Sequence, residues 1–309
     1  MIAGMKAPQR NPRPWRMFLP FFGLLGLAAA WSAYWYIGLE TARTVAGQER
    51  QKLAEDGLTL ACAEEGWGGY PFRFEFSCLE ADIQSAGRFR LQTARIQAVA
   101  QAYNPWHVIV MADGSSRFSL AGRPELAATH GRTLASIRLD GNRMPQISAE
   151  IPRLAVENLF AAETVRVHLR PEPEGATGLA ASVAKFRFAA PDQPPLDIDS
   201  GEFLGTLTRG GTLQIGNLTL KKGAVTYRGA GTAALDAMRR VSGMLNTETN
   251  DIQGLLKILE PFFALKPEQL NAMATMLQVL GPGAKADLIA RDGELFLGPF
   301  KIADLLPIH

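Results

Sequence analysis

The residues that could support metal or acid–base chemistry are few and lie far apart in this sequence. The sequence contains four histidines, none with a partner at the spacing of a metal site: His107, His130, His168 and His309. Residues 197–201 read Asp-Ile-Asp-Ser-Gly and begin like a calcium-binding loop, but Thr208 stands where such a loop requires an acidic residue. We therefore expect no metal site.

One glycine-rich segment resembles a nucleotide-binding loop. Residues 229–234 read Gly-Ala-Gly-Thr-Ala-Ala and match the pattern G-x-G-x-x-A. That loop belongs to a parallel α/β sheet, whereas the strands predicted before it alternate as in an antiparallel sheet. We interpret the segment as a turn between a strand and a helix, and we expect no cofactor.

No nucleophile stands out either. No serine lies in a G-x-S-x-G sequence, and residues 113–116, Asp-Gly-Ser-Ser, are typical of a polar turn. No two carboxylates are placed to flank a glycosidic bond. We therefore expect no enzyme and assign no catalytic residue; a hydrolase whose triad assembles from distant positions is an alternative.

The charge of the 309-residue chain is unevenly distributed. Residues 1–39 carry Lys6, Arg10, Arg13 and Arg16 and no acidic residue. Removing these four from the 32 basic residues leaves 28 against 30 acidic residues in the rest of the chain. This nearly neutral body argues against a nucleic-acid-binding protein. Apolar residues make up 47% of the chain, which favours a folded protein over a disordered one.

Residues 17–39 form an uncharged stretch long enough to cross a bilayer. At about 1.5 Å per residue, they span a hydrocarbon core of about 30 Å. Four aromatic residues gather at the far end as in an interfacial belt: Trp31, Tyr34, Trp35 and Tyr36. The basic residues before the stretch place segment 1–16 in the cytoplasm and the body across the membrane. A signal peptide cleaved after the alanines at 28–30 is the alternative, and both interpretations export the body.

The two cysteines fit an exported protein. Cys62 and Cys78 are the only cysteines, and a single pair in an oxidising compartment is expected to form a disulfide. Two buried thiols are the alternative. Residues 40–60, between the membrane segment and this pair, predict a polar juxtamembrane helix.

From residue 61 to about 230 the dominant period of the sequence is two. Apolar and polar residues alternate in at least five stretches, at 72–77, 88–92, 164–170, 185–188 and 217–221. Each stretch predicts a half-buried strand of an antiparallel sheet. Helical spacing follows at 233–245, 251–264 and 267–280, and a hairpin is predicted at 286–297. We expect a mainly β protein: an N-terminal transmembrane helix, then one elongated curved antiparallel sheet over 61–309 with a helical insertion at about 233–280.

Three short motifs carry a resemblance to a known family. They are Gly69-Tyr70-Pro71-Phe72, Tyr103-Asn104-Pro105-Trp106 and the segment 292–299, Asp-Gly-Glu-Leu-Phe-Leu-Gly-Pro. Together with the anchor they resemble an uncharacterised family of membrane-anchored envelope proteins of Gram-negative bacteria, and more distantly the AsmA-like proteins. This resemblance implies an inner-membrane protein with a periplasmic body, a curved sheet with an apolar groove, and a role in lipid transport or outer-membrane maintenance. The chain is shorter than most bridge-like AsmA-like proteins, which speaks against a conduit across the periplasm.

The faces of the predicted strands supply the candidate binding residues. The candidate groove residues are Phe72, Phe74, Phe76, Phe89, Leu91, Phe186 and Phe188, and the candidate lipid-headgroup contacts are Arg88, Arg90 and Arg187. An ordinary core covered by the C-terminal helices, and an ordinary solvated charged face, are the alternatives.

We expect a protein that binds membrane lipid or another apolar ligand along this groove. An envelope protein is a second expected partner. A structural scaffold with a closed core is the alternative function.

Overall fold

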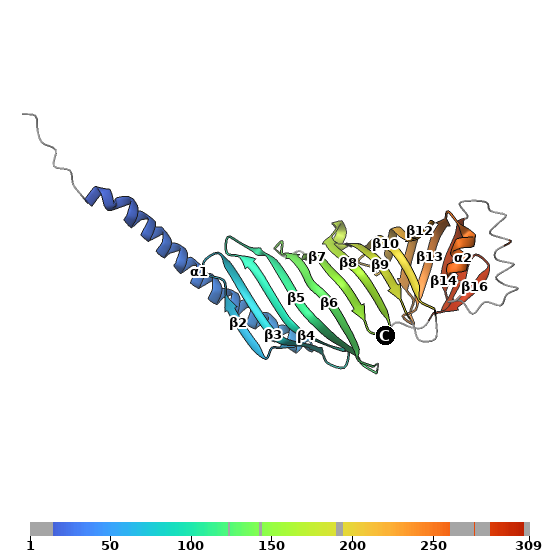
Figure 1. Ribbon diagram of the computed structural model, residues 1–309, viewed down its shortest axis with the longest axis horizontal. Coiled ribbons are helices and arrows are strands. Elements are labelled where there is room, and N and C mark those ends of the chain that lie inside the picture. Colours follow the sequence, from blue (N-terminus) through green and yellow to red (C-terminus); the bar gives the residue numbers. More distant parts are fainter. Residues whose placement is uncertain are drawn as a thin grey trace, which may run out of the picture.

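The computed structural model describes residues 15–122, 124–141, 144–189, 194–259, 275 and 285–305. The described chain forms one long helix followed by a single row of strands that twists and curves away from the helix (Figure 1). The predicted fold, mainly β with an open antiparallel sheet, is confirmed.

The first element is helix α1 (Trp15–Glu55), which has 41 residues. It joins the predicted membrane segment and most of the predicted juxtamembrane segment into one helix that is long and apolar enough to cross a membrane from Phe18 onward. The predicted helix at 40–60 is too long by a few residues, because the chain turns at Gly57, whose positive φ of 82° suits glycine, and enters a strand.

Sixteen strands then pair in one sheet. They are β1 (Leu58–Ala61), β2 (Glu64–Gly68), β3 (Arg73–Ser85), β4 (Phe89–Gln101), β5 (Asn104–Leu120), β6 (Leu126–Arg138), β7 (Gln146–Val156), β8 (Phe160–Pro171), β9 (Thr177–Phe188), β10 (Leu196–Leu207), β11 (Leu213–Lys222), β12 (Val225–Leu235), β13 (Val241–Thr249), β14 (Lys285–Arg291), β15 (Glu294–Leu297) and β16 (Phe300–Asp304). From β3 onward each strand pairs antiparallel with the next one in the chain, while β1 and β2 both pair with β3. A short 3-10 helix, η1 (Pro173–Gly175), lies between β8 and β9.

The register places apolar side chains of successive strands opposite one another. Leu91 pairs with Phe118, Val165 with Val183, and Phe203 with Leu218. The side of the sheet that carries these pairs is called the apolar face. Charged residues gather on the other side, the charged face, where cross-strand ion pairs join neighbouring strands: Arg90–Asp82, Arg132–Asp113, Arg166–Glu150, Arg187–Asp197 and Arg228–Glu248.

Two local predictions from the sequence are wrong. Residues 113–116 do not form a turn: they lie within β5, where Gly114 takes a positive φ of 100° at a β-bulge. Residues 233–245 do not form a helix, because β12 continues to Leu235 and β13 begins at Val241. The turn between them is fixed by Asp236, whose carboxylate accepts hydrogen bonds from the backbone N–H groups of Met238 and Arg240.

The described helical part of the predicted insertion begins at α2 (Ile252–Leu259), within the stretch predicted at 251–264. Asp251 precedes this helix, and its carboxylate accepts a hydrogen bond from the N–H of Gly254 at 2.9 Å, as an N-cap residue does. The helix predicted at 267–280 lies outside the described residues except for Thr275, which is helical. The predicted hairpin at 286–297 is confirmed as β14 and β15.

The predicted disulfide is confirmed. Cys62 and Cys78 are joined across a sequence separation of 16, and they tie the segment between β1 and β2 to β3. The end of the sheet that carries β1–β3 is called its first end. Cys78 is fully buried, so the bridge lies inside this first end and not on its surface.

Removal of this disulfide should destabilise the body. We expect the double variant Cys62→Ser, Cys78→Ala to lose about 3 kcal/mol of unfolding free energy, because the bridge restricts the unfolded chain. Urea unfolding followed by circular dichroism measures the loss. A reductant should lower the wild-type midpoint and leave that of the variant unchanged; equal midpoints without reductant would contradict the expectation.

Candidate functional site

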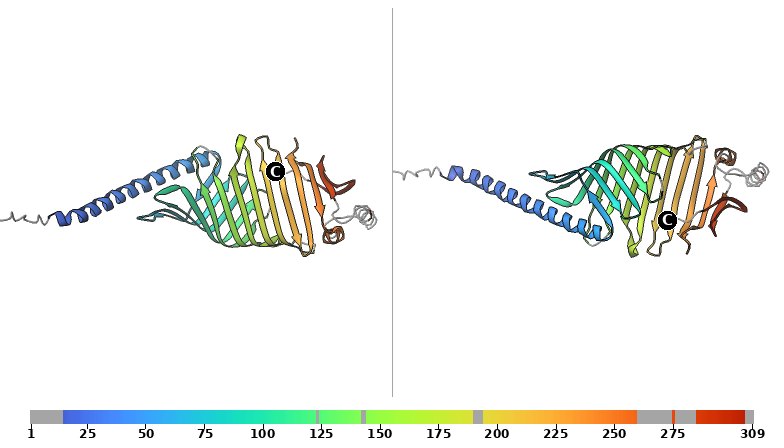
Figure 2. Two further views of the ribbon diagram at one scale, coloured as in Figure 1. Left: turned by 90° about the horizontal axis from the view of Figure 1, so that it is seen from above. Right: turned by 90° about the horizontal axis from the view of Figure 1, so that it is seen from below.

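The candidate site is the apolar face of the sheet. Large apolar side chains in the middle of this face are half-buried, although none of the described helices lies over β5–β9 (Figures 1 and 2). They are shielded by their neighbours on the same face. Only seven apolar residues of the described chain are buried, and four of them are Ala81, Ala102, Ala162 and Ala290. The described sheet therefore has no second layer that converts its apolar face into a core.

Helix α1 covers the first end of the apolar face. The rings of Trp35 and Phe74 stack with centroids 6.1 Å apart, and a Cβ atom on Gly38 would lie only 2.6 Å from the Phe74 ring. Further along the helix, the Arg50 guanidinium lies 4.9 Å from the centroid of Phe76. Two of the predicted groove residues, Phe74 and Phe76, therefore lie against the helix.

An ion pair joins the C-terminal part of α1, around Arg50, to the sheet. Arg50 donates a hydrogen bond of 2.7 Å to the carboxylate of Glu65 on β2. This hydrogen bond lowers the pKa of Glu65 below its ordinary value, with a smaller contribution from the Trp67 N–H, which also donates to this carboxylate.

Four other predicted groove residues lie on the apolar face in two patches. Phe89 contacts Phe118 with ring centroids 6.1 Å apart, and Leu91 is opposite Phe118 in the register. Phe186 contacts Phe160 with centroids 5.9 Å apart, and Phe188 is opposite Phe160. The patches are on β4–β5 and β8–β9, about 20 Å apart at the usual strand spacing.

The strands between these patches continue the apolar face, and the sequence predictions missed them. Their inward residues include Val108 and Val110 on β5, Ile147 and Ile151 on β7, and Ala135 on β6. Bulges interrupt the two-residue period in these strands, and small residues such as Ala149 give little hydrophobic signal.

The predicted headgroup residues do not join the phenylalanines. Arg90 and Arg187 lie on the charged face, where they donate hydrogen bonds to the carboxylates of Asp82 and Asp197. Arg88 is exposed in the turn between β3 and β4. Phe72, the remaining predicted groove residue, lies in the turn before β3 and is 62% exposed.

One polar cluster interrupts the apolar face. The hydroxyl of Ser116 on β5 lies 3.0 Å from Nε2 of His130 on β6, and the hydroxyl of Thr133 lies 3.1 Å from Nδ1. The carbonyl of Gly131 lies 2.8 Å from the same Nδ1. Thr93 is opposite Ser116 in the register, is 6% exposed, and has a hydroxyl without a hydrogen-bond partner among the described residues. The sequence gives no signal for this cluster, because a bulge brings its members together.

The other chemical candidates from the sequence have structural roles. Residues 229–234 lie within strand β12, and a Cβ atom on Gly229 would meet the Leu245 side chain at 2.8 Å. The glycines thus make room for the side chains and backbone of β13, and the predicted turn between a strand and a helix is wrong because these residues lie inside a strand. Asp197 is paired with Arg187, and Asp199 accepts a hydrogen bond from the N–H of Gly223. The described residues contain no cluster of three metal-ligating side chains.

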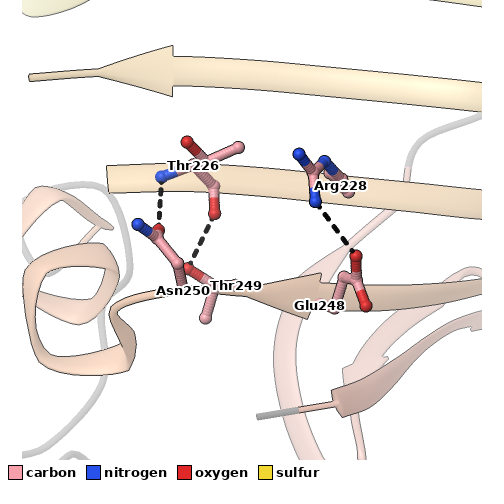
Figure 3. A pocket seen from close by; sticks show the side chains of 5 residues that line it. All are labelled: Thr226, Arg228, Glu248, Thr249 and Asn250. Atoms are coloured by element: carbon pink, nitrogen blue, oxygen red, sulfur yellow. Dashed lines mark hydrogen bonds and ion pairs between the residues drawn. The ribbon is translucent and has the colours of Figure 1, made fainter. Parts of the chain in front are cut away.

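A small pocket of about 260 Å³ at the end of β12 and β13 is also structural (Figure 3). The amide oxygen of Asn250 accepts a hydrogen bond of 2.6 Å from the N–H of Thr226, and the Thr249 hydroxyl donates to the Thr226 carbonyl. Arg228 pairs with Glu248 at 3.5 Å. These polar groups satisfy one another and fix the strand ends before α2.

In a comparison with protein families, most of the chain matches one family. Residues 35–305 match the family described as "Uncharacterized protein conserved in bacteria (DUF2125)". The chain belongs to this family. The match begins within α1 at Trp35 and ends just after β16, so it includes most of the docked part of the helix and the complete described sheet. Neither the curated proteins nor the solved structures contain a match to the chain.

The ion pairs of the charged face should make stability depend on pH. Hydrogen bonds from Arg90 and Arg187 lower the pKa of Asp82 and Asp197 in the folded state. Since these pKa values lie below those of the unfolded chain, the stabilisation is present above the ordinary aspartate pKa and is lost as the pH falls through the folded value. We expect the urea midpoint of the wild type to decrease as the pH is lowered below about 4. The decrease should be less steep in the variant Asp82→Asn, Asp197→Asn.

The matched control for this experiment is Glu163→Gln, which changes an exposed carboxylate on β8. The control should keep the wild-type pH profile. An identical profile for the Asp82→Asn, Asp197→Asn variant would show that these ion pairs add nothing measurable, as is common for solvated pairs.

Proposed function

We propose that this protein is a membrane-anchored, non-enzymatic bacterial envelope protein that binds lipid acyl chains along the apolar face of its sheet. The observation that carries the proposal is the run of apolar side chains across β5–β9, broken only by the polar cluster around His130 among the described residues, that no described element covers. A soluble protein rarely leaves so large an apolar surface without a ligand or partner.

The dimensions of this face suit an acyl chain. From β5 to β9 the apolar face extends over four strand spacings, about 19 Å. One leaflet of the hydrocarbon core is about 15 Å thick, which is the reach of one acyl chain. Each methylene removed from water stabilises the complex by about 0.8 kcal/mol. Binding of this kind needs no cofactor and no chemical step.

The anchor supports a membrane location for this activity. Helix α1 is long and apolar enough to span a bilayer, and basic residues precede it in the sequence. We propose that it crosses the inner membrane with the N-terminus in the cytoplasm and the body in the periplasm. The disulfide supports an oxidising compartment for the body.

A second candidate function, ester hydrolysis, is favoured by the Ser116–His130 pair. A serine nucleophile requires a histidine that a third group orients, usually a carboxylate. Here the carbonyl of Gly131 and the hydroxyl of Thr133 face Nδ1 of His130. Two further serine–histidine pairs of the same kind, His107 with Ser136 and His168 with Ser148, link neighbouring strands on the charged face. The pairing is thus a recurrent cross-strand contact, and we favour binding over catalysis.

A serine-directed fluorophosphonate probe tests the hydrolase alternative. We expect no covalent labelling of the full-length protein, because Ser116 has no base oriented by a carboxylate. Mass spectrometry of the probed protein is the measurement. Labelling that disappears in Ser116→Ala but persists in the matched variant Ser136→Ala would overturn the non-enzymatic proposal.

Photocrosslinking tests the binding proposal. The full-length protein is placed in vesicles that contain a phospholipid with a diazirine near the end of one acyl chain, and crosslinked peptides are identified by mass spectrometry. We expect crosslinks in the strands β5–β9 in addition to α1, because both contact acyl chains. Phe118→Asp with Phe186→Asp should strongly reduce the strand crosslinks, because buried carboxylates oppose acyl binding.

The matched control changes the opposite face of the sheet. Ile109→Asp with Leu204→Asp introduces the same charges at side chains that are 41% and 52% exposed, and should leave the crosslinks unchanged. Crosslinks confined to α1 in the wild type would overturn the proposal and favour a scaffold that binds protein partners in the envelope.

A further inference from the structure

A length argument determines how close the body must lie to the membrane. The uncharged stretch of α1 begins after Arg16 and needs about 20 residues to cross the hydrocarbon core. Counted from Met17, the crossing therefore extends to about Tyr36. The helix, however, contacts the sheet from Trp31 onward. The part of α1 that precedes the sheet, from Met17 to Ala30, is only about 21 Å long.

Two turns of the sheet lie beside this last part of the membrane segment. In the turn between β2 and β3, the Tyr70 hydroxyl lies 2.8 Å from that of Ser32, and the Pro71 carbonyl accepts a hydrogen bond of 2.9 Å from the Trp31 indole. In the turn between β4 and β5, the Ala102 carbonyl accepts a hydrogen bond of 2.6 Å from Tyr34. Both turns are therefore held at the level of helix residues 31–34.

Both turns have the composition of a membrane interface. Residues 66–72 and 96–106 contain no charged residue. Four large aromatic side chains are exposed in them: Tyr70 is 55% exposed, Phe72 62%, Tyr103 67% and Trp106 65%. Aromatic side chains of this kind gather where a protein meets the headgroup region of a bilayer. Exposed aromatics on a water-facing turn would have no such explanation.

We infer that the turn 69–72 and the segment 102–106, which comprises the turn between β4 and β5 and the start of β5, insert into the membrane interface beside α1, so that the first end of the sheet lies in direct contact with lipid. The inference rests on the proposal that α1 spans the membrane. The partner of the two turns is the lipid bilayer, because α1, the helix proposed to cross the bilayer, continues without interruption into contact with both turns.

This placement gives a route from the bilayer to the apolar face. At the edge of the sheet that carries these turns, the face begins with Phe74, Ala100, Val108 and Ile137, in register across β3–β6. An acyl chain leaving the outer leaflet between the inserted turns would meet this apolar row before it met a charged side chain of the opposite face.

The inference is tested by the depth of single labelled positions. Tyr103→Cys and Trp106→Cys variants of the full-length protein carry an environment-sensitive fluorophore; the native cysteines are bridged and do not react. The protein is reconstituted into phosphatidylcholine–phosphatidylglycerol vesicles that contain a phospholipid with a nitroxide near the headgroup end of its acyl chain. We expect strong loss of fluorescence at both positions and weak quenching by aqueous iodide.

Two matched positions show whether proximity to α1 matters. Met238→Cys labels an equally exposed side chain in the β12–β13 turn, about 38 Å away along the sheet, on the same edge. Glu157→Cys labels the turn between β7 and β8 on the opposite edge. Both should be quenched by iodide and not by the lipid nitroxide. If positions 103 and 106 behave like these controls, the inference is wrong.

A label at Leu24→Cys separates this inference from the anchoring proposal. Position 24 lies in the middle of the membrane segment and should be inaccessible to iodide if α1 spans the bilayer. Protection at position 24 combined with aqueous exposure at 103 and 106 would overturn the inserted turns alone. Exposure at position 24 would overturn the membrane anchor, and the inference with it.

Discussion

The hydrogen-bond ladder between neighbouring strands is the interaction on which the described structure depends. In most domains a sheet is stabilised by a second layer that buries its apolar side. Here the described strands lie in one layer, and the fully buried apolar residues within it are small, apart from Cys78. Each strand from β3 onward pairs with its neighbour in the chain, so the contacts that hold the sheet are local in sequence.

The docking of α1 gives this open sheet a fixed end. Trp35, Leu39 and Ala102 form a small buried cluster, and Trp31, Trp67 and Phe74 pack against it. Trp35 donates its indole N–H to the carbonyl of Arg73, so the aromatic side chains that fill the cluster also satisfy backbone groups of the sheet. A helix joined in this way cannot swing freely relative to the sheet.

The sequence predicted the architecture well because a period of two is a strong signal. The alternation around Phe74, Val167 and Leu218 depends only on which side of a strand is apolar, and each of these strands exists. The places where this alternation is interrupted, by a bulge or by closely approaching strands, are predicted poorly from the sequence. The sequence favours a turn at Gly114 and another at the glycines of 229–231, because a turn, a bulge and a close approach of strands all select glycine. Only the neighbouring strand distinguishes these cases.

The candidate site was harder to predict than the fold, for a related reason. The sequence shows that a strand has two faces but not what lies over each of them. Phe74 and Phe186 have the same local pattern, yet one lies against Trp35 of α1 and the other against Phe160 of the neighbouring strand β8. The arginines show the same limit, since the partner of Arg187 on β9 is Asp197 on β10, beyond the loop that joins the two strands.

The pairing of charges on one face determines what the other face can recognise. Because Arg90, Arg166 and Arg187 of the charged face are matched by carboxylates on adjacent strands, these arginines present little net field to an anionic headgroup. Under the proposed function, recognition on the apolar face depends on shape and burial, which distinguish one acyl chain from another only weakly. The polar cluster of Ser116, His130 and Thr133 is the exception between β4 and β6, among the described residues. A bound acyl chain that carries a hydrogen-bonding group near this cluster would gain a directional contact that a plain hydrocarbon lacks. Thr93 lies at the same position: it is buried opposite Ser116, and its hydroxyl has no hydrogen-bond partner among the described residues.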